Sequence, residues 1–219
     1  MFLKLDPELS SKFPTLSARI TNIHEVNIKP QNPELEAFKM QVFEEAAEKW
    51  NVEELKDNQV FRAYRDFFWK VRVDPTKTRP AAEALLRRIL RGNPLPTINT
   101  LVDAYNLASV STSIPFGAFD LDMMRGAPVM REAKPGEDFL GIGMDEPIIL
   151  GGGEAVIEDN ERLIAVYPYR DADYSKVTTS TRNLLLMTCG VPGVMEEALS
   201  HAEEVCIEYI KRFCGGTPA

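Results

Sequence analysis

The spacing of apolar residues changes about half-way along the chain, and this change restricts the possible folds more than any other feature. Before Phe119, apolar residues recur at the three- and four-residue intervals of amphipathic helices. After Phe119, short apolar runs are separated by Gly, Pro and Asp turns, a pattern typical of antiparallel strands. Helices that come before strands, instead of alternating with them, predict an α+β fold with a largely antiparallel sheet.

The first half contains one predicted strand and four predicted helices. Apolar and polar side chains alternate over 18–28, as they do in a half-buried strand. Asn32 is placed to cap a helix that runs through Trp50. Further helices are expected over 57–71, over 80–91, where Gly92 ends the helix, and from Ile98 onward, followed by a loop from Ile114 to Asp120.

The second half contains short strands and one long helix. Strand-like runs lie at 127–133, 138–142, 147–151, 154–159, 162–167 and 184–189. The glycines of 151–153 have neither the spacing nor the lysine of a phosphate-binding loop, so we expect a hairpin turn there. Residues 195–213 are predicted to form an amphipathic closing helix whose water-facing glutamates are Glu196, Glu197, Glu203 and Glu204.

The composition excludes several classes of protein and of site. Cys189, Cys206 and Cys214 are an odd number without a CxxC spacing, which favours buried, reduced thiols over disulfides or a zinc site. With only two histidines, His-based triads and multi-His metal sites are nearly excluded. No apolar stretch reaches membrane-spanning length and the N-terminus lacks the apolar core of a signal peptide, so we expect a cytoplasmic protein.

The charge is unevenly distributed along the chain. The net charge of −8 argues against a protein that coats nucleic acid without sequence preference. Between Arg62 and Arg91, however, nine basic residues face three acidic ones, and Arg87, Arg88 and Arg91 share one side of a predicted helix. This basic segment is either an RNA contact or a solvated helix face, and charge alone favours the solvated face.

Three polar clusters are candidates for a binding or catalytic site. Asn99, Asp103 and Asn106 lie at i, i+4 and i+7, on one side of a helix. Buried polar groups are costly unless they are paired, so these side chains either hold neighbouring loops or face a cavity, and the pattern alone favours the loops. The other clusters are the charged turn over 166–176 and the hydroxyl-rich segment over 177–183. Each also has a structural explanation, an Arg–Asp pair in the turn and hydroxyls that cap backbone groups.

Residues 95–122, LPTINTLVDAYNLASVSTSIPFGAFDLD, resemble the B3/B4 domain of the β subunit of phenylalanyl-tRNA synthetase. The chain looks like the free-standing proteins that consist of this domain alone. The similarity continues through MREAKPGED and VTTSTRNLLL and covers roughly Thr78 to Thr188. The resemblance implies one B3/B4-like domain over 1–219, with the family core at about 78–188, an N-terminal helical extension over 1–77 and a C-terminal helix over 193–214.

The resemblance also implies a reaction. In the synthetase this domain proofreads, hydrolysing the ester of a wrong amino acid, tyrosine, on the tRNA for phenylalanine. A second site of this kind is needed because a synthetic pocket discriminates poorly against small differences. It binds the terminal adenosine and the aminoacyl group and positions a water beside the ester carbonyl, without a nucleophilic side chain. The expected function is therefore trans-editing of mischarged tRNA, with tRNA as the partner, no cofactor and no metal.

The site residues carried over from the resemblance show several departures from the family pattern. Asn106 matches the helix Asn of the editing pocket, whereas Tyr105 stands for a Thr, Gly117 for a His and Met187 for a Glu. The glycine-rich turn of the synthetases becomes Tyr169-Arg170-Asp171-Ala172. The expected substrate-binding residues are Tyr105, Asn106, Gly117, Tyr169, Arg170, Asp171, Thr181 and Met187. Asn106 and Asp171 are the candidates for positioning the water.

These departures alter the expected substrate. The family's His and Glu help to recognise tyrosine, so their absence predicts a smaller or differently polar aminoacyl group, with Arg170 and Asp171 as new polar contacts. Arg87, Arg88 and Arg91 are the expected RNA contacts, and neither DNA nor a membrane is expected as a partner. Two alternatives remain open: a non-catalytic module that binds tRNA, an amino acid or a protein, and a protein that binds or hydrolyses a free small metabolite.

Overall fold

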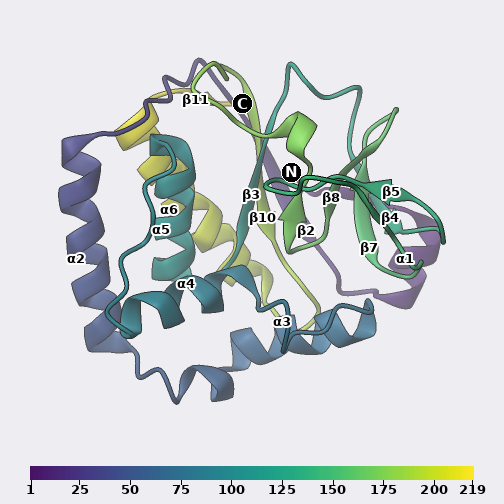
Figure 1. Cartoon of the computed structure of the whole chain (residues 1–219), viewed down its shortest axis with the longest axis horizontal. Helices are drawn as coiled ribbons and strands as arrows, with labels where there is room; N and C mark the ends of the chain where they lie inside the picture. Colours follow the sequence, from purple (N-terminus) through teal and green to yellow (C-terminus); the bar gives the residue numbers. More distant parts are fainter.

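Two sheets and a layer of helices make up the computed structural model, which describes every residue from Met1 to Ala219 (Figure 1). The helices are α1 (Pro7–Lys12), α2 (Pro33–Lys49), α3 (Gln59–Lys70), α4 (Ala81–Leu90), α5 (Thr100–Thr112) and α6 (Glu196–Cys214), with 3-10 turns η1 (Leu55–Asp57) and η2 (Asp173–Ser175). The strands are β1 (Lys4–Leu5), β2 (Ala18–His24), β3 (Phe116–Asp120), β4 (Val129–Glu132), β5 (Asp138–Phe139), β6 (Ile148–Ile149), β7 (Ala155–Glu158), β8 (Leu163–Val166), β9 (Arg170–Asp171), β10 (Leu184–Cys189) and β11 (Thr217–Pro218).

The predicted α+β class is confirmed, but the strands form two main sheets and a two-stranded ribbon instead of one sheet. One sheet has the order β11-β2-β10-β3 and the other β1-β4-β7-β8-β9, while β5 and β6 pair only with each other. All named strand pairs are antiparallel except β1 with β4. The four-stranded sheet is the central layer, with helices α2, α5 and α6 on one side and the five-stranded sheet on the other (Figure 1).

Strand β10 shows why this sheet occupies the centre. All six of its residues are buried. Because side chains alternate between the faces of a strand, Leu185, Met187 and Cys189 enter the core shared with α3 and the five-stranded sheet. Leu184 and Leu186 enter the core shared with α2, α4, α5 and α6. A strand that is buried on both faces has a continuous apolar sequence, which is why the run over 184–189 was predicted as a strand.

Helix boundaries agree with the sequence signals because those signals are hydrogen-bonding groups. The side chain of Asn32 accepts hydrogen bonds from the backbone N–H groups of Glu34, at 2.8 Å, and Leu35. Gly92 follows α4 with φ +75°, a conformation that favours glycine. No helix is both long and apolar enough to cross a membrane.

Three local predictions are wrong. Residues 116–120 form β3, paired with β10, instead of continuing the loop expected from Ile114. The glycines of 151–153 do not close a hairpin, since β6 pairs with β5 whereas β7 pairs with β4 and β8. Glu203 does not face water: it is buried and accepts hydrogen bonds from Arg19 Nε and Thr21 Oγ1, both at 2.7 Å. The hydrogen bonds from the Arg19 guanidinium and the Thr21 hydroxyl offset the cost of burying the Glu203 carboxylate.

The N-terminal segment is part of the core. Besides helices, residues 1–77 supply β1 and the strand predicted over 18–28, which forms as β2 and pairs with β10 through residues 18–23. Helix α3 contributes Tyr64, Phe67 and Phe68 to the core between the two sheets. Helix α3 is therefore part of the core between the sheets, and α2 packs against α4 and α5 instead of forming a separate lid.

Candidate functional site

A cavity of about 70 Å³ lies where β3 and β10 meet the turn between β8 and β9. Asp171 is the single charged residue among those that line it, and most of the others are apolar. Ala81, at the start of α4, closes one side. We call this hollow the Asp171 cavity. A lone carboxylate in an apolar hollow is a group whose ionisation depends on its surroundings.

The geometry of the Asp171 cavity depends on a missing side chain at Gly117. Gly117 and Met187 are direct cross-strand partners in the pairing of β3 with β10. A Cβ added to Gly117 would lie 3.1 Å from Met187 Cε and 3.3 Å from each carboxylate oxygen of Asp171. Asp171 and Met187 therefore fill the space that a side chain at position 117 would need.

The carboxyl of Asp171 is poised to exchange a proton near neutral pH. Burial raises its pKa from 3.8 to about 7, because the charged form loses water. A hydrogen bond from the backbone N–H of Ala118 opposes this effect and favours the carboxylate. A group with such a pKa is suited to take a proton from water at the pH of a cell.

Tyr105 on α5 is close enough to Asp171 for the two to interact electrostatically. Burial, followed by repulsion from the Asp171 carboxylate, raises the pKa of the Tyr105 phenol far above its ordinary value. The phenol therefore stays protonated and can donate a hydrogen bond. Tyr169, which lines the cavity, is half-buried and its pKa is likewise raised by burial.

Four of the eight predicted substrate-binding residues thus line the Asp171 cavity, namely Gly117, Tyr169, Asp171 and Met187. Tyr105 does not line it but is near enough for the charge of Asp171 to raise the pKa of its phenol. Arg170 lies elsewhere. It donates a hydrogen bond to the carbonyl of Ile142 at 2.8 Å, and its side chain covers Gly141 so closely that a Cβ there would collide with it. Arg170 and Asp171 form no ion pair, because adjacent residues of β9 point to opposite faces.

Thr181 also has a structural position. Its hydroxyl donates to Asp120 Oδ2 at 2.6 Å and accepts from the backbone N–H of Thr178 at 2.9 Å. Asp120 is at the far end of β3, three residues from Gly117, or about 10 Å along a strand. Thr181 thus fixes the hydroxyl-rich segment to the end of β3.

The polar stripe on α5 faces α2. Asn99 caps α5 by accepting from the N–H groups of Leu101 and Val102. Asp103 accepts from Lys39 Nζ at 2.7 Å, with both side chains buried, and from the N–H of Ile98. Asn99 and Asp103 thus have structural roles, as the sequence pattern favoured. They hold α5 against α2 and the preceding loop, and not against residues 114–120.

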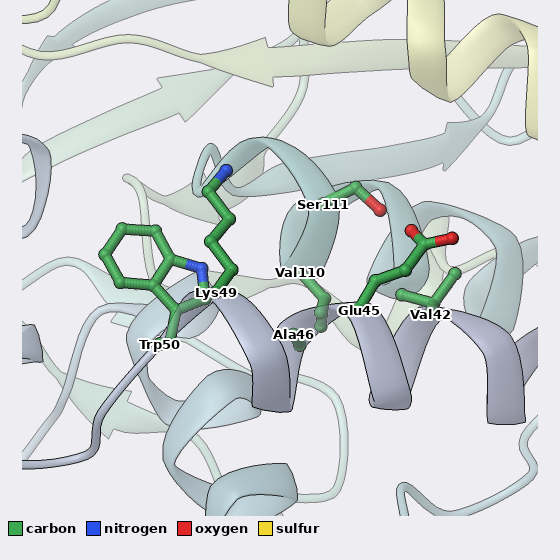
Figure 2. A pocket seen from close by; sticks show the side chains of 7 residues that line it. All are labelled: Val42, Glu45, Ala46, Lys49, Trp50, Val110 and Ser111. Atoms are coloured by element: carbon green, nitrogen blue, oxygen red, sulfur yellow. The ribbon is translucent and has the colours of Figure 1, made fainter.

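Asn106 lies on the same side of α5 as Asp103 and is not among the residues of the Asp171 cavity. It is partly exposed, and its side chain makes no hydrogen bond within the chain. The next residue along that side, Val110, lines a hollow of about 120 Å³ between α2 and α5. Figure 2 shows Glu45 of α2 and Ser111 of α5 pointing toward one another across this hollow, with Lys49 beside Trp50.

Three arginines of the basic segment surround one buried acid. Glu83 is fully buried and contacts Arg65, Arg87 and, at 3.6 Å, Arg79. Arg87, whose side chain is 13% exposed, is therefore an internal partner of Glu83. Arg88 and Arg91 are exposed. Of the three predicted RNA contacts, these two are available to a partner.

Sequence reasoning overlooked Cys189 and Phe116 as cavity residues. The signal for Cys189 was the two-residue period of β10, which puts positions 187 and 189 on one face. Burial raises the pKa of the Cys189 thiol well above its usual value, so it is a wall of the cavity and not a thiolate. No group of three or more His, Cys, Asp or Glu side chains is arranged to hold a metal ion.

The family described as the B3/4 domain matches residues 63–215. The chain belongs to the B3/4 domain family. This B3/4 domain is 31% identical over 102 residues to the phenylalanine–tRNA ligase β subunit of Fusobacterium nucleatum, and 34% identical over 104 residues to that of Psychrobacter arcticus. The matches cover 46% and 48% of this chain but 12% of each relative, so the chain corresponds to a small part of those proteins.

The fold of this B3/4 domain is also found in a solved structure. An N-terminal fragment of the phenylalanyl-tRNA synthetase β subunit from Pyrococcus horikoshii is similar with a TM-score of 0.52 and 13% identity. The similarity covers 99% of this chain and 49% of the fragment. At this identity the likeness establishes the fold alone.

Proposed function

We propose that the chain hydrolyses the ester between a wrong amino acid and a tRNA. The observation that carries the proposal is the Asp171 carboxyl, with a pKa of about 7, inside a cavity formed by three positions at which the chain departs from the editing pattern. Membership of the B3/4 domain family and similarity to phenylalanine–tRNA ligase β subunits support tRNA as the source of the ester.

In the proposed reaction, Asp171 is the general base. It takes a proton from a water molecule while the water oxygen forms a bond to the ester carbonyl carbon. The neutral phenol of Tyr105 donates a hydrogen bond to the carbonyl oxygen, which becomes negative in the transition state. The carbon–oxygen bond to the ribose then breaks, and the protonated Asp171 returns the proton to the leaving hydroxyl. Carboxylic acid and alcohol are the products.

The cavity also limits the amino acid. Its volume of about 70 Å³ leaves room for a few water molecules or a small side chain. Met187 and Asp171 occupy the space beside Gly117. The proposed substrate is therefore an ester of a small amino acid and not of tyrosine.

A panel of mischarged tRNAs tests this proposal. The wild type should release small amino acids fastest, and Asp171→Asn should lower the rate by a factor of about 100 to 10,000, the usual contribution of a general base. Asp173→Asn is the matched control, because Asp173 is two residues away and pairs with Lys176 at the surface. Release of tyrosine ahead of all others, or equal rates for the two variants, would contradict the proposal.

A second function is favoured by one observation: Asn106, the matched pocket residue, is not among the residues that line the small Asp171 cavity. A chain that kept the fold without the reaction would bind tRNA or another partner non-catalytically. In the same panel, such a protein would bind the tRNAs and hydrolyse none of them.

A further inference from the structure

A groove with an exposed tryptophan lies beside the Asp171 cavity. It has a volume of about 240 Å³ and is lined by Arg65, Trp69, Pro75, Thr76 and Arg79, and we call it the Trp69 groove. Trp69 is 57% exposed, although it belongs to a helix whose other aromatic residues are buried. The indole lies outside the core and between two arginines, so its face is accessible to a ligand.

The two arginines are fixed in place by Glu83. Arg65 Nε donates to Glu83 Oε2 at 2.9 Å, and Arg79 lies 3.6 Å from the same carboxylate. Glu83 is fully buried, whereas Arg65 and Arg79 are 29% and 40% exposed. The buried acid therefore holds two cations at the edge of the groove. Cations that are already oriented lose less conformational entropy when they bind an anion.

The Trp69 groove is next to the Asp171 cavity. Arg79 lines the groove and Ala81 lines the cavity, and two residues of chain span at most about 7 Å. On the neighbouring helix, Phe68 packs against Tyr169 of the cavity with ring centroids 6.3 Å apart, and Trp69 follows directly. The groove and the cavity therefore lie on either side of the same short segment, residues 79–81, within reach of one extended ligand.

We propose that the Trp69 groove binds single-stranded RNA, namely the nucleotides that precede the esterified end of the substrate. One base stacks on the indole of Trp69, and Arg79 and Arg65 contact the adjoining phosphates. Aromatic platforms flanked by cations bind single strands in this way, because every base has a face that stacks. This inference rests on the proposed function, since it assigns the strand that carries the ester.

Fluorescence of Trp69 reports stacking directly. The chain has two tryptophans, so Trp50→Phe leaves Trp69 as the only indole. A short single-stranded RNA should quench its emission, whereas the same RNA in a duplex should not. Quenching by both forms, or by neither, would overturn the proposal.

Affinity for uncharged tRNA tests the contribution of each residue. Trp69→Ala should weaken binding about tenfold, equal to about 1.4 kcal/mol, and Trp69→Phe should restore part of the loss. Arg79→Ala should reduce the slope of log affinity against log salt by about one. Arg62→Ala is the matched control, because Arg62 lies on α3, the helix of Trp69, with a 63% exposed side chain outside the groove. Equal losses for Arg62→Ala and Arg79→Ala would show general charge attraction and contradict a specific site.

Deacylation by the same variants separates this inference from the proposed function. If RNA quenches Trp69 but no ester is hydrolysed, the Trp69 groove binds RNA and the proposed hydrolase function is wrong. If Trp69→Ala hydrolyses aminoacyl-tRNA at the wild-type rate, the hydrolase function stands and the proposal that the Trp69 groove binds the substrate strand is wrong.

Discussion

The carboxylate of Asp171 lies where a side chain at Gly117 would project, with both oxygens 3.3 Å from the position of its Cβ. The two residues belong to different sheets, β9 and β3, so the space between the sheets is shared by positions that are distant in sequence. The Asp171 carboxylate can therefore occupy its position only because residue 117 has no side chain.

Gly117→Ala tests this dependence. The new methyl group would crowd Met187 Cε and the Asp171 carboxylate, both of them ends of side chains that can move. We expect a loss of about 1 kcal/mol in unfolding free energy from urea titration, with hydrolysis reduced by more than this loss explains. Gly151→Ala is the control, because its Cβ would meet only Glu154, at an ordinary 3.6 Å. Equal activity of the two variants would contradict the dependence.

The raised pKa of Asp171 predicts a characteristic dependence of stability on pH. Between pH 3.8 and about 7 the folded state holds a proton at Asp171 that the unfolded state has released, so this group's contribution falls as pH rises. Asp171→Asn removes the effect. Relative to wild type, the variant should gain about 3 kcal/mol of unfolding free energy between pH 4.5 and pH 8.5. A constant difference across that range would show that the pKa of Asp171 is ordinary.

The buried pair of Lys39 and Asp103 predicts a non-additive result. Lys39→Met leaves Asp103 as a buried charge without its counter-ion and should cost about 3 to 5 kcal/mol of unfolding free energy. Asp103→Leu should cost less, because Lys39 keeps its ion pair with Glu36 at 2.8 Å. The double variant should recover most of this cost, since two apolar side chains replace the pair. A double-mutant cycle in urea measures the coupling, and additive losses would show that the two charges do not depend on each other.

The basic segment predicts different outcomes for neighbouring arginines. Arg88→Glu and Arg91→Glu change exposed side chains and should weaken tRNA binding without lowering the melting temperature. Arg87→Glu places a second acid beside the buried Glu83 and should mainly lower the melting temperature. Binding assays and thermal melts on the three variants distinguish these effects. Unchanged tRNA binding in the Arg88 and Arg91 variants would remove them as RNA contacts.

The elements that the sequence predicted well are those specified by local chemistry. Asn32 and Gly92 mark helix ends because their own groups satisfy or permit the backbone there. Strand β3 was not predicted, because its FGAFD sequence is short and its pairing partner, β10, lies more than 60 residues later. The partition into two sheets likewise depends on pairings between distant segments.

The candidate site was predicted in part for the same reason. Resemblance identified Gly117, Asp171 and Met187 one by one, but only the fold shows that they share one space. The separation of Arg170 from Asp171 follows from strand alternation once β9 is known, and the turn sequence gave no sign of that strand. Glu203 was misplaced because its partners, Arg19 and Thr21, are on a strand at the other end of the chain.

The most direct test of the account is the pH dependence of deacylation under single-turnover conditions, on the best substrate from the tRNA panel. If Asp171 is the base, the wild-type rate should rise tenfold per pH unit below its pKa of about 7 and level off above it. Asp171→Asn should be slower by a factor of at least about 100 at pH 8 and should lack this inflection. A wild-type profile without an inflection near 7, or an Asp171→Asn variant with the wild-type rate, would contradict the assignment of Asp171 as the general base.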